Sequence, residues 1–149
     1  NKTQVVGGIQ NIPTILNQQQ ETYFYETYFS SKERSLIETN APRSKVNFTI
    51  NYNVNKLSVM LRNIYWGEVT RDEFPFGTTQ LHKGKVTTDL SLGYDIIKQL
   101  NLSVGVNNLL DKFPDQQVYE NSYFGVFKYA PVQMGTMGRF YFARLTLKL

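Results

Sequence analysis

The only histidine of the chain, His82, is the first residue to consider for metal binding or proton transfer. It stands in a polar stretch with no second histidine nearby, and the chain has no cysteine. A metal site needs several such ligands close together. We therefore predict that His82 is exposed to solvent, and that disulfides, thiolate metal sites and cysteine nucleophiles are excluded.

Two other patterns suggest chemistry but have simpler interpretations. Asp111 and Asp115 resemble a carboxylate pair, yet Pro114 beside them favours turns, so we expect both aspartates to form turns. Gly135 and Gly138 lack the strand-to-helix context of a phosphate loop and predict a bend. The sequence thus predicts no catalytic residue, no cofactor and no metal, and an enzyme is not expected.

Residues suited to binding a bulky ligand lie instead in the predicted connections. Aromatic and arginine side chains there can supply stacking and charge. Packing within the loops, or a place in an interfacial girdle, is the alternative role for the same residues. The predicted ligand-binding residues are Trp66, Arg71, Tyr119, Tyr123 and Phe124.

Charge and hydropathy narrow the possible partners. The net charge is +4, but the 16 Lys and Arg residues are scattered without a basic run, which argues against nucleic-acid binding. No apolar run approaches the roughly 18 residues of a membrane helix. A membrane barrel needs no such run, because each strand has about ten residues and only every second one must be apolar.

The elements that would position these residues are strands, recognised by alternation of apolar and polar residues. In Leu100 to Asn107, for example, Leu102, Val104 and Val106 alternate with small polar residues. The sequence predicts five such strands, over Lys45 to Asn53, Leu57 to Trp66, Lys85 to Ile96, Leu100 to Asn107 and Arg139 to Leu149. On the combined apolar face, Arg139 is the only charged residue.

The connections between these strands alternate in length. Residues 54–56 and 97–99 are tight reversals, whereas 67–84 and 109–138 are long loops. The asymmetry predicts an up-and-down antiparallel sheet with its long loops at one end, as in outer-membrane barrels. On the apolar face, Tyr52 and Tyr94 lie near the short turns, and Tyr65 and Tyr141 near the long loops, as two interfacial girdles would require.

The first 44 residues are less regular. Thr3 to Ile9 has a β-like pattern and is interpreted as the end of a strand. A helix can be placed over Pro13 to Tyr28, but its aromatic and β-branched content argues against it. The stretch near 10–44 is therefore predicted as a long loop.

Two motifs resemble a known family. The sequence VGVNNLLDKFPD, over residues 104–115, resembles the V-x-N-L-F-D signature near the C-terminus of TonB-dependent outer-membrane receptors, with Leu110 where Phe is usual. Glu38 to Lys45 matches the E-T-x-x-P-R-S-K pattern that leads down from an outer loop. The chain departs from the family at its end, where Leu147, Lys148 and Leu149 stand in place of a terminal aromatic residue.

The resemblance implies that residues 1–149 form the C-terminal part of such a barrel. The fold class is then an all-β, antiparallel, up-and-down transmembrane barrel segment, with about five to six strands of a larger barrel. Its implied function is to supply wall and extracellular loops for TonB-energised uptake of a scarce nutrient, such as a siderophore, cobalamin or a glycan. Its partners would be outer-membrane lipid, the remaining strands, the plug domain and, through the missing N-terminal part with its TonB box, TonB itself. The implied location is the bacterial outer membrane.

Alternation alone leaves two alternatives open. A soluble barrel or sandwich that binds a small ligand or sugar also alternates, with its apolar face turned inward. A structural barrel segment of a secretion or surface complex would look the same. An apolar face that points outward would indicate a membrane wall, and one that points inward a soluble core. The exposure of Phe48, Leu92, Val104 and Leu147 distinguishes the two.

Overall fold

The computed structural model of the chain describes residues 4, 31–73, 78–118 and 126–148. Its strands confirm the predicted all-β, antiparallel class. The elements are α2 (Ser31–Glu38), β1 (Lys45–Val54), β2 (Leu57–Trp66), β3 (Val69–Glu73), β4 (Thr78–His82), β5 (Lys85–Ile97), β6 (Leu100–Asn107) and β7 (Phe140–Leu147). No helix among the described residues is long and apolar enough to cross a membrane.

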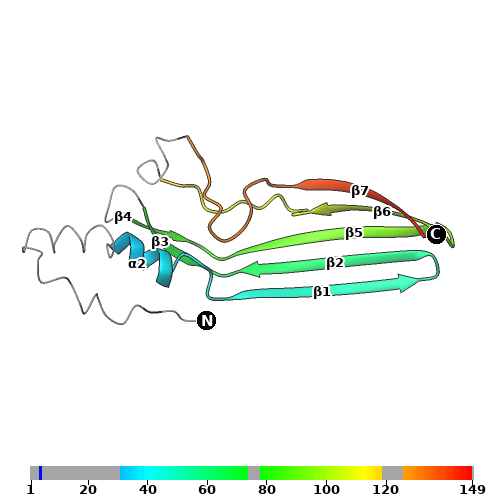
Figure 1. Cartoon of the computed structure of the whole chain (residues 1–149), viewed down its shortest axis with the longest axis horizontal. Coiled ribbons are helices and arrows are strands. Elements are labelled where there is room, and N and C mark those ends of the chain that lie inside the picture. The colour runs from blue at the N-terminus through cyan, green and yellow to red at the C-terminus, as the bar shows by residue number, and fades with distance from the viewer. Residues whose placement is uncertain (1–3, 5–30, 74–77, 119–125, 149) are drawn as a thin grey trace, which may run out of the picture.

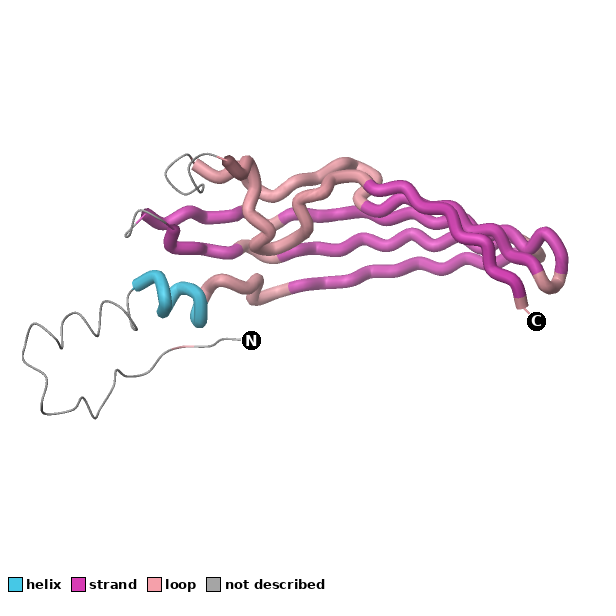
Figure 2. Tube along the Cα trace, turned by 45° about the horizontal axis from the view of Figure 1, so that its top comes forward, coloured by secondary structure: helices cyan, strands magenta, loops and turns pink. Residues whose placement is uncertain are grey.

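Five of these strands form one up-and-down sheet in the order β1-β2-β5-β6-β7. All five predicted strands are present, with ends that differ by one or two residues. The tight turns lie at one end of the sheet and the long connections at the other (Figures 1 and 2). Asn55 has a positive φ of 52° in the β1–β2 reversal, a conformation that asparagine tolerates better than most residues.

Two parts of the predicted loops are ordered, which corrects the sequence prediction. Residues 67–84 contain a hairpin, β3–β4, that forms a separate two-stranded sheet. The stretch near 10–44 contains the helix α2, where Thr39 Oγ1 donates to Ser35 O at its C-terminal end. Both elements are short, so periodicity gives little signal. The expectations for Thr3 to Ile9 and Pro13 to Tyr28 lie outside the described residues.

The register aligns the alternating apolar stripes of all five strands on one face. Ile50 pairs with Leu61, Leu61 with Leu90 and Leu90 with Val106. Because side chains alternate along each strand, this single row fixes the face of every other residue. The predicted stripes therefore join into one continuous apolar surface.

Much of this surface is exposed in the part of the chain that the structure describes. Phe48, Leu92, Val104 and Leu147 are 59%, 41%, 43% and 61% exposed. They do not meet in a closed interior. The buried apolar residues that the structure describes are few, and Val69, Ala130 and Met134 among them come from the loop end.

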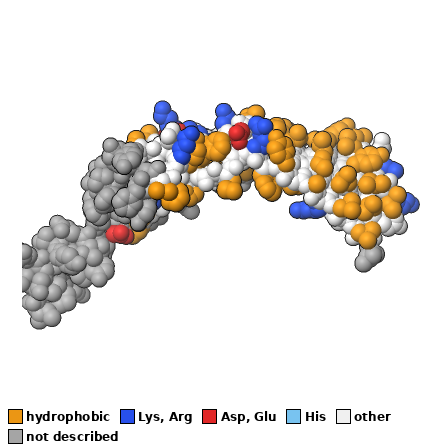
Figure 3. All heavy atoms as spheres, turned by 90° about the horizontal axis from the view of Figure 1, so that it is seen from above, with side chains coloured by type: hydrophobic (Ala, Val, Ile, Leu, Met, Phe, Trp, Pro, Cys, Tyr) orange, Lys and Arg blue, Asp and Glu red, His pale blue; other side chains and the backbone are white. Residues whose placement is uncertain are grey.

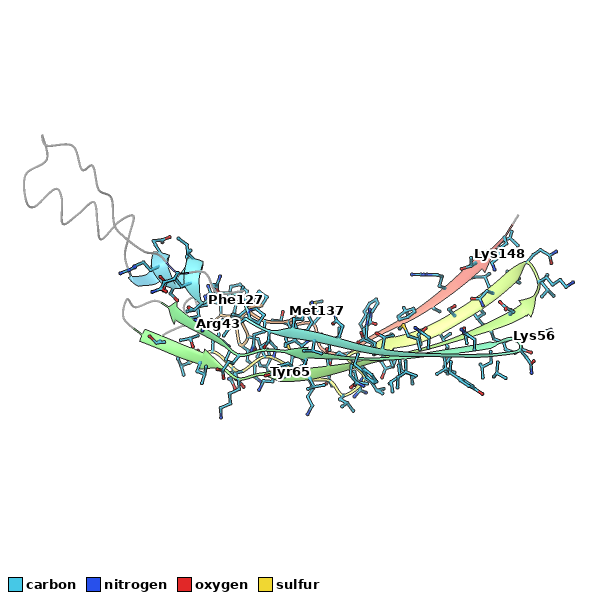
Figure 4. The ribbon with its side chains drawn as sticks, turned by 90° about the horizontal axis from the view of Figure 1, so that it is seen from below. Arg43, Lys56, Tyr65, Phe127, Met137 and Lys148 are labelled. Carbon is cyan, nitrogen blue, oxygen red and sulfur yellow. The ribbon has the colours of Figure 1, made fainter. Side chains whose placement is uncertain are left out.

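The sheet is curved, and its two faces differ in shape as well as in chemistry. Figure 4 shows Tyr65 on the convex side, whereas Met137 of the last long connection lies on the concave side. In Figure 3 hydrophobic side chains gather over the end of the molecule that contains the C-terminal strand. The apolar face is thus convex, and the polar face lines a hollow.

The tyrosines occupy the predicted ends of the convex face. Tyr52 and Tyr94 lie beside the short turns and are 60% and 50% exposed. Tyr65 and Tyr141 lie near the long connections and are 41% and 67% exposed. Their placement matches the two predicted rows.

On the concave face, Gly105 leaves room for an aromatic ring. A methyl group at Gly105 would overlap the ring of Phe142, its partner on β7, and approach the carbonyl oxygen of Leu90 to 2.9 Å. Gly105→Ala should therefore destabilise the sheet by about 1–3 kcal/mol, as overpacking does. The measurement is the thermal unfolding midpoint of the full-length protein. Gly135→Ala is the matched control, because nothing lies within 4 Å of the added methyl group. Equal midpoints for the two variants would contradict the packing.

Candidate functional site

An ion pair on the concave face anchors the candidate site. Arg62 of β2 and Asp89 of β5 are directly opposite each other in the register. Arg62 donates from Nη2 and Nε to Asp89 Oδ2, at 2.7 and 3.0 Å. Asp89 is only 6% exposed, and its other oxygen accepts the backbone N–H of Asn108 at 2.8 Å. One carboxylate thus connects β2, β5 and the end of β6.

Asn108 begins a turn that redirects the chain after β6. Its side chain closes the turn on itself, accepting from Lys112 N at 2.9 Å and donating to Lys112 O at 2.7 Å. Asn108 and Asp111 both have positive φ, at 54° and 53°. Asp111 also accepts the backbone N–H of Arg139 at 2.8 Å. The prediction that Asp111 forms a turn is confirmed, and its carboxylate also fixes the start of β7.

The prediction that Asp115 forms a turn is wrong, because Asp115 lies in no turn. Its Oδ2 accepts the backbone N–H of Lys83 at 2.6 Å, and its Oδ1 pairs with Lys85 Nζ at 2.5 Å. Partial burial alone raises the pKa of Asp115, but the hydrogen bonds from Lys85 Nζ and Lys83 N, together with the charges of Lys85 and His82, lower it below 3.8 overall. Asp115 therefore attaches the long connection to the β4–β5 junction.

A groove of about 260 Å³ lies between this ion pair and the last connection. Strands β2 and β5 form its floor with the side chains of Trp66, Asp89 and their neighbours. Met134 and Met137 come from the connection, and Met137 is 90% exposed. The groove residues are Arg62, Ile64, Trp66, Thr87, Asp89, Asn107, Asn108, Met134, Gly135, Met137 and Gly138.

Trp66 is held in a fixed orientation at the edge of the groove. Its Nε1 donates to Thr87 Oγ1 at 3.0 Å, and Lys45 Nζ lies 3.8 Å from the ring centroid. A cation over an indole face is attractive and helps to hold both groups. The ring therefore has one polar contact and one cationic contact, and its remaining surface borders the groove.

The other predicted ligand-binding residues are not assembled around Trp66. Arg71 belongs to β3, opposite Gln80, and is not among the groove residues. Tyr119, Tyr123 and Phe124 lie outside the described residues. Of the two predicted residues that the structure describes, Trp66 lies in the groove and Arg71 does not.

His82 is fully buried, which contradicts its predicted exposure. It ends β4 and pairs with Val69 of β3, which is 2% exposed. The physical reason is that the last connection covers this hairpin, and Gln133 Nε2 donates to the carbonyl oxygens of Gly67, His82 and Lys83 at 2.5 to 3.1 Å. Sequence reasoning missed Gln133, because a single polar residue in an aperiodic stretch carries no signal. No group of three potential metal ligands occurs in the described part of the chain.

Removing Arg62 or Asp89 from the ion pair should have different effects on the amide of Asn108. Asp89→Ala leaves the buried N–H of Asn108 without its acceptor, which costs about 1–3 kcal/mol. Arg62→Ala leaves the buried Asp89 carboxylate without its cation, but the N–H of Asn108 keeps its acceptor, so this amide should stay protected. Hydrogen exchange of the Asn108 amide in the full-length protein measures the difference. Faster exchange in Arg62→Ala than in Asp89→Ala would contradict this role for Asp89.

No protein-family model matches the chain, and no curated protein matches its sequence. Among solved structures, the fold is similar to part of a ferric enterobactin receptor from Pseudomonas aeruginosa, a mutant in complex with enterobactin. The TM-score is 0.53 and the sequence identity 22%, and the match covers 72% of this chain and 16% of that chain. At this identity the likeness shows the fold: an antiparallel sheet like a segment of that receptor.

Proposed function

We propose that the chain supplies part of the wall and the extracellular loops of an outer-membrane receptor for TonB-energised uptake of a scarce nutrient. The observation that carries the proposal is the continuous convex apolar face, which spans five strands and is largely exposed among the described residues. Residues on it such as Phe48, Tyr94 and Leu145 are 59%, 50% and 64% exposed. In water such a surface would drive aggregation, whereas hydrocarbon covers it at no cost.

The opposite face supports the same proposal. It carries Arg62, Asp89 and Arg144, and the paired carboxylate of Asp89 accepts further hydrogen bonds. Charged groups belong on the water-filled side of a membrane barrel, and apolar groups on its lipid side. A sandwich or soluble barrel would have the reverse arrangement, with the apolar face on the concave side.

The free edges of the sheet define the first partners. Strands β1 and β7 each pair on one side only within the described sheet. A membrane barrel must satisfy every backbone group, so both edges would pair with the remaining strands of the receptor. Lipid would cover the convex face, and a plug domain with its TonB-binding segment would belong to the missing part.

The orientation follows from the lengths of the connections. Outer-membrane barrels have short periplasmic turns and long extracellular loops. The end with the β3–β4 hairpin, α2 and the 108–138 connection would therefore face the exterior (Figure 1). The groove beside Trp66 opens on the inner surface below these elements.

For the ligand, we propose an iron-chelating siderophore, as in the solved neighbour with enterobactin bound. Trp66 is supported as a contact by its fixed ring at the groove. Arg71, Tyr119, Tyr123 and Phe124 remain proposed contacts in the outer loops. Aromatic faces and arginine suit a large, anionic, aromatic ligand.

Substitutions at two adjacent residues test which face of β1 contacts lipid. Ile50 is on the convex face and 48% exposed, and Asn51 is on the concave face. Ile50→Lys should destabilise the barrel by about 2–4 kcal/mol, because a lysine near the bilayer midplane is costly. Asn51→Lys should have little effect, since its side chain faces water.

The measurement is the folded, heat-modifiable fraction of the full-length receptor in outer-membrane preparations. Equal loss in both variants, or purification of the wild-type protein as a monodisperse species without detergent, would contradict a membrane wall.

The ligand assignment has a separate test. Trp66→Ala should weaken binding of ferric enterobactin to the full-length receptor at least about fivefold, as loss of an aromatic contact at a binding hot spot does. Asn53→Ala, on the same face but beside the short turn, is the control and should bind as the wild type does. Fluorescence titration gives both affinities. A wild type that does not bind this probe would exclude the ligand class and leave the wall proposal intact.

A further inference from the structure

The outer ends of two connections are joined into a single packed unit. Val69 and His82 of the β3–β4 hairpin are 2% and 0% exposed, and Ala130 and Met134 of the later connection are 5% and 6% exposed. These residues are among the few buried ones that the structure describes. The unit gives the chain a small core of its own, away from the apolar convex face.

Several hydrogen bonds join the later connection to the β3–β4 hairpin. Gln133 Nε2 donates to backbone carbonyls at the open end of the hairpin, those of Gly67 just before β3 and His82 at the end of β4. Asp115 accepts from Lys83 N and pairs with Lys85. Further along, Gln80 donates to the carbonyl oxygen of Gln116 at 2.9 Å and accepts from Val118 N at 3.3 Å. We call the contacts that Asp115 and Gln133 make with residues 67–85 the outer latch.

His82 lies inside the latch as an isolated imidazole. Neither ring nitrogen has a hydrogen-bond partner among the described residues. The charged groups that act on it are Asp115 from the later connection, Arg71 from β3 and Lys85 from β5. Lys83 follows it in the chain, and α2, which packs against β3, carries Glu33, Arg34 and Glu38.

We propose that the outer latch is acid-sensitive: it is closed while His82 is neutral and opens when His82 takes up a proton. Opening would separate residues 113–118 and 126–134 from the β3–β4 hairpin and change the access to the end of the sheet that carries the groove. The proposal does not depend on the nutrient or on the membrane location.

The geometry explains why a proton would open the latch. Burying an imidazolium without a hydrogen-bond partner costs free energy. A protonated His82 must therefore gain a partner or move into solvent. Asp115 is the acidic group that acts on the ring, but its Oδ1 is taken by Lys85 and its Oδ2 by Lys83 N. A charged His82 would have to compete with both, and the bonds it displaces are those that close the latch.

The direction of the pH dependence follows from the pKa. Burial lowers the pKa of His82 below 6.5, and Arg71 and Lys85 lower it further against the opposing charge of Asp115. An opened, solvated His82 has an ordinary pKa and binds a proton first. The closed form therefore loses stability as pH falls from above 6.5 toward the lowered pKa, and regains it on return to neutral pH. Asp115 does not titrate in this window, because its pKa lies below 3.8.

Hydrogen exchange of the full-length protein between pH 7.5 and 5.0 tests the proposal. The reporters are the amides of Lys83 and Val118, which donate to Asp115 Oδ2 and to Gln80 Oε1. After correction for intrinsic exchange rates, their protection should fall by up to about tenfold per pH unit below 6.5. The amide of Arg139, which donates to Asp111, is the internal control and should keep its protection.

Two neutral replacements test whether His82 causes the pH dependence of protection. His82→Gln and His82→Leu differ in size and polarity but cannot gain a charge, so at least one should stay protected from pH 7.5 to 5.0. A flat profile in the wild type overturns the proposal, and so does an unchanged pH dependence in both variants. Loss of protection in both variants at pH 7.5 also overturns it, since an uncharged residue at 82 would then not keep the latch closed.

Discussion

The structure depends on the strict register of five antiparallel strands, which gives the sheet two chemically opposite faces. Each cross-strand row, such as Ile50, Leu61 and Leu90, consists of residues that point the same way. A slip of one residue in any strand would move its apolar side chains to the polar face. The convex apolar surface, the concave polar surface and the two rows of tyrosines all follow from this one constraint.

The concave face shows how the long connections are attached to the sheet. Asp89 holds Arg62 across two strands and the N–H of Asn108 at the end of β6. Asp115 makes a second attachment at Lys83 and Lys85. Few carboxylates therefore determine where the long connection runs, and that path creates the groove beside Trp66. The groove depends on tertiary contacts and not on any local motif.

The similarity to a segment of a ferric enterobactin receptor agrees with this architecture at the level of fold. The match covers 16% of that receptor's chain. The two faces of the sheet differ: the apolar face is convex and exposed, and the charged groups lie on the concave face. That pattern is the physical basis for proposing a membrane wall.

The sequence by itself determined the strands, their faces and the alternation of short and long connections, because period-2 alternation and turn residues are local signals. It also marked Asp111 as a turn residue, and Asp111 adopts a positive φ. Only the tertiary structure decided that the apolar face is convex, that 67–84 forms a hairpin, and that His82 is buried. The contacts responsible join residues far apart in the chain, such as Lys83 with Asp115 and Gln133 with His82, separated by 32 and 51 positions. No local pattern encodes such pairs, because they form only after the sheet has brought its loop ends together.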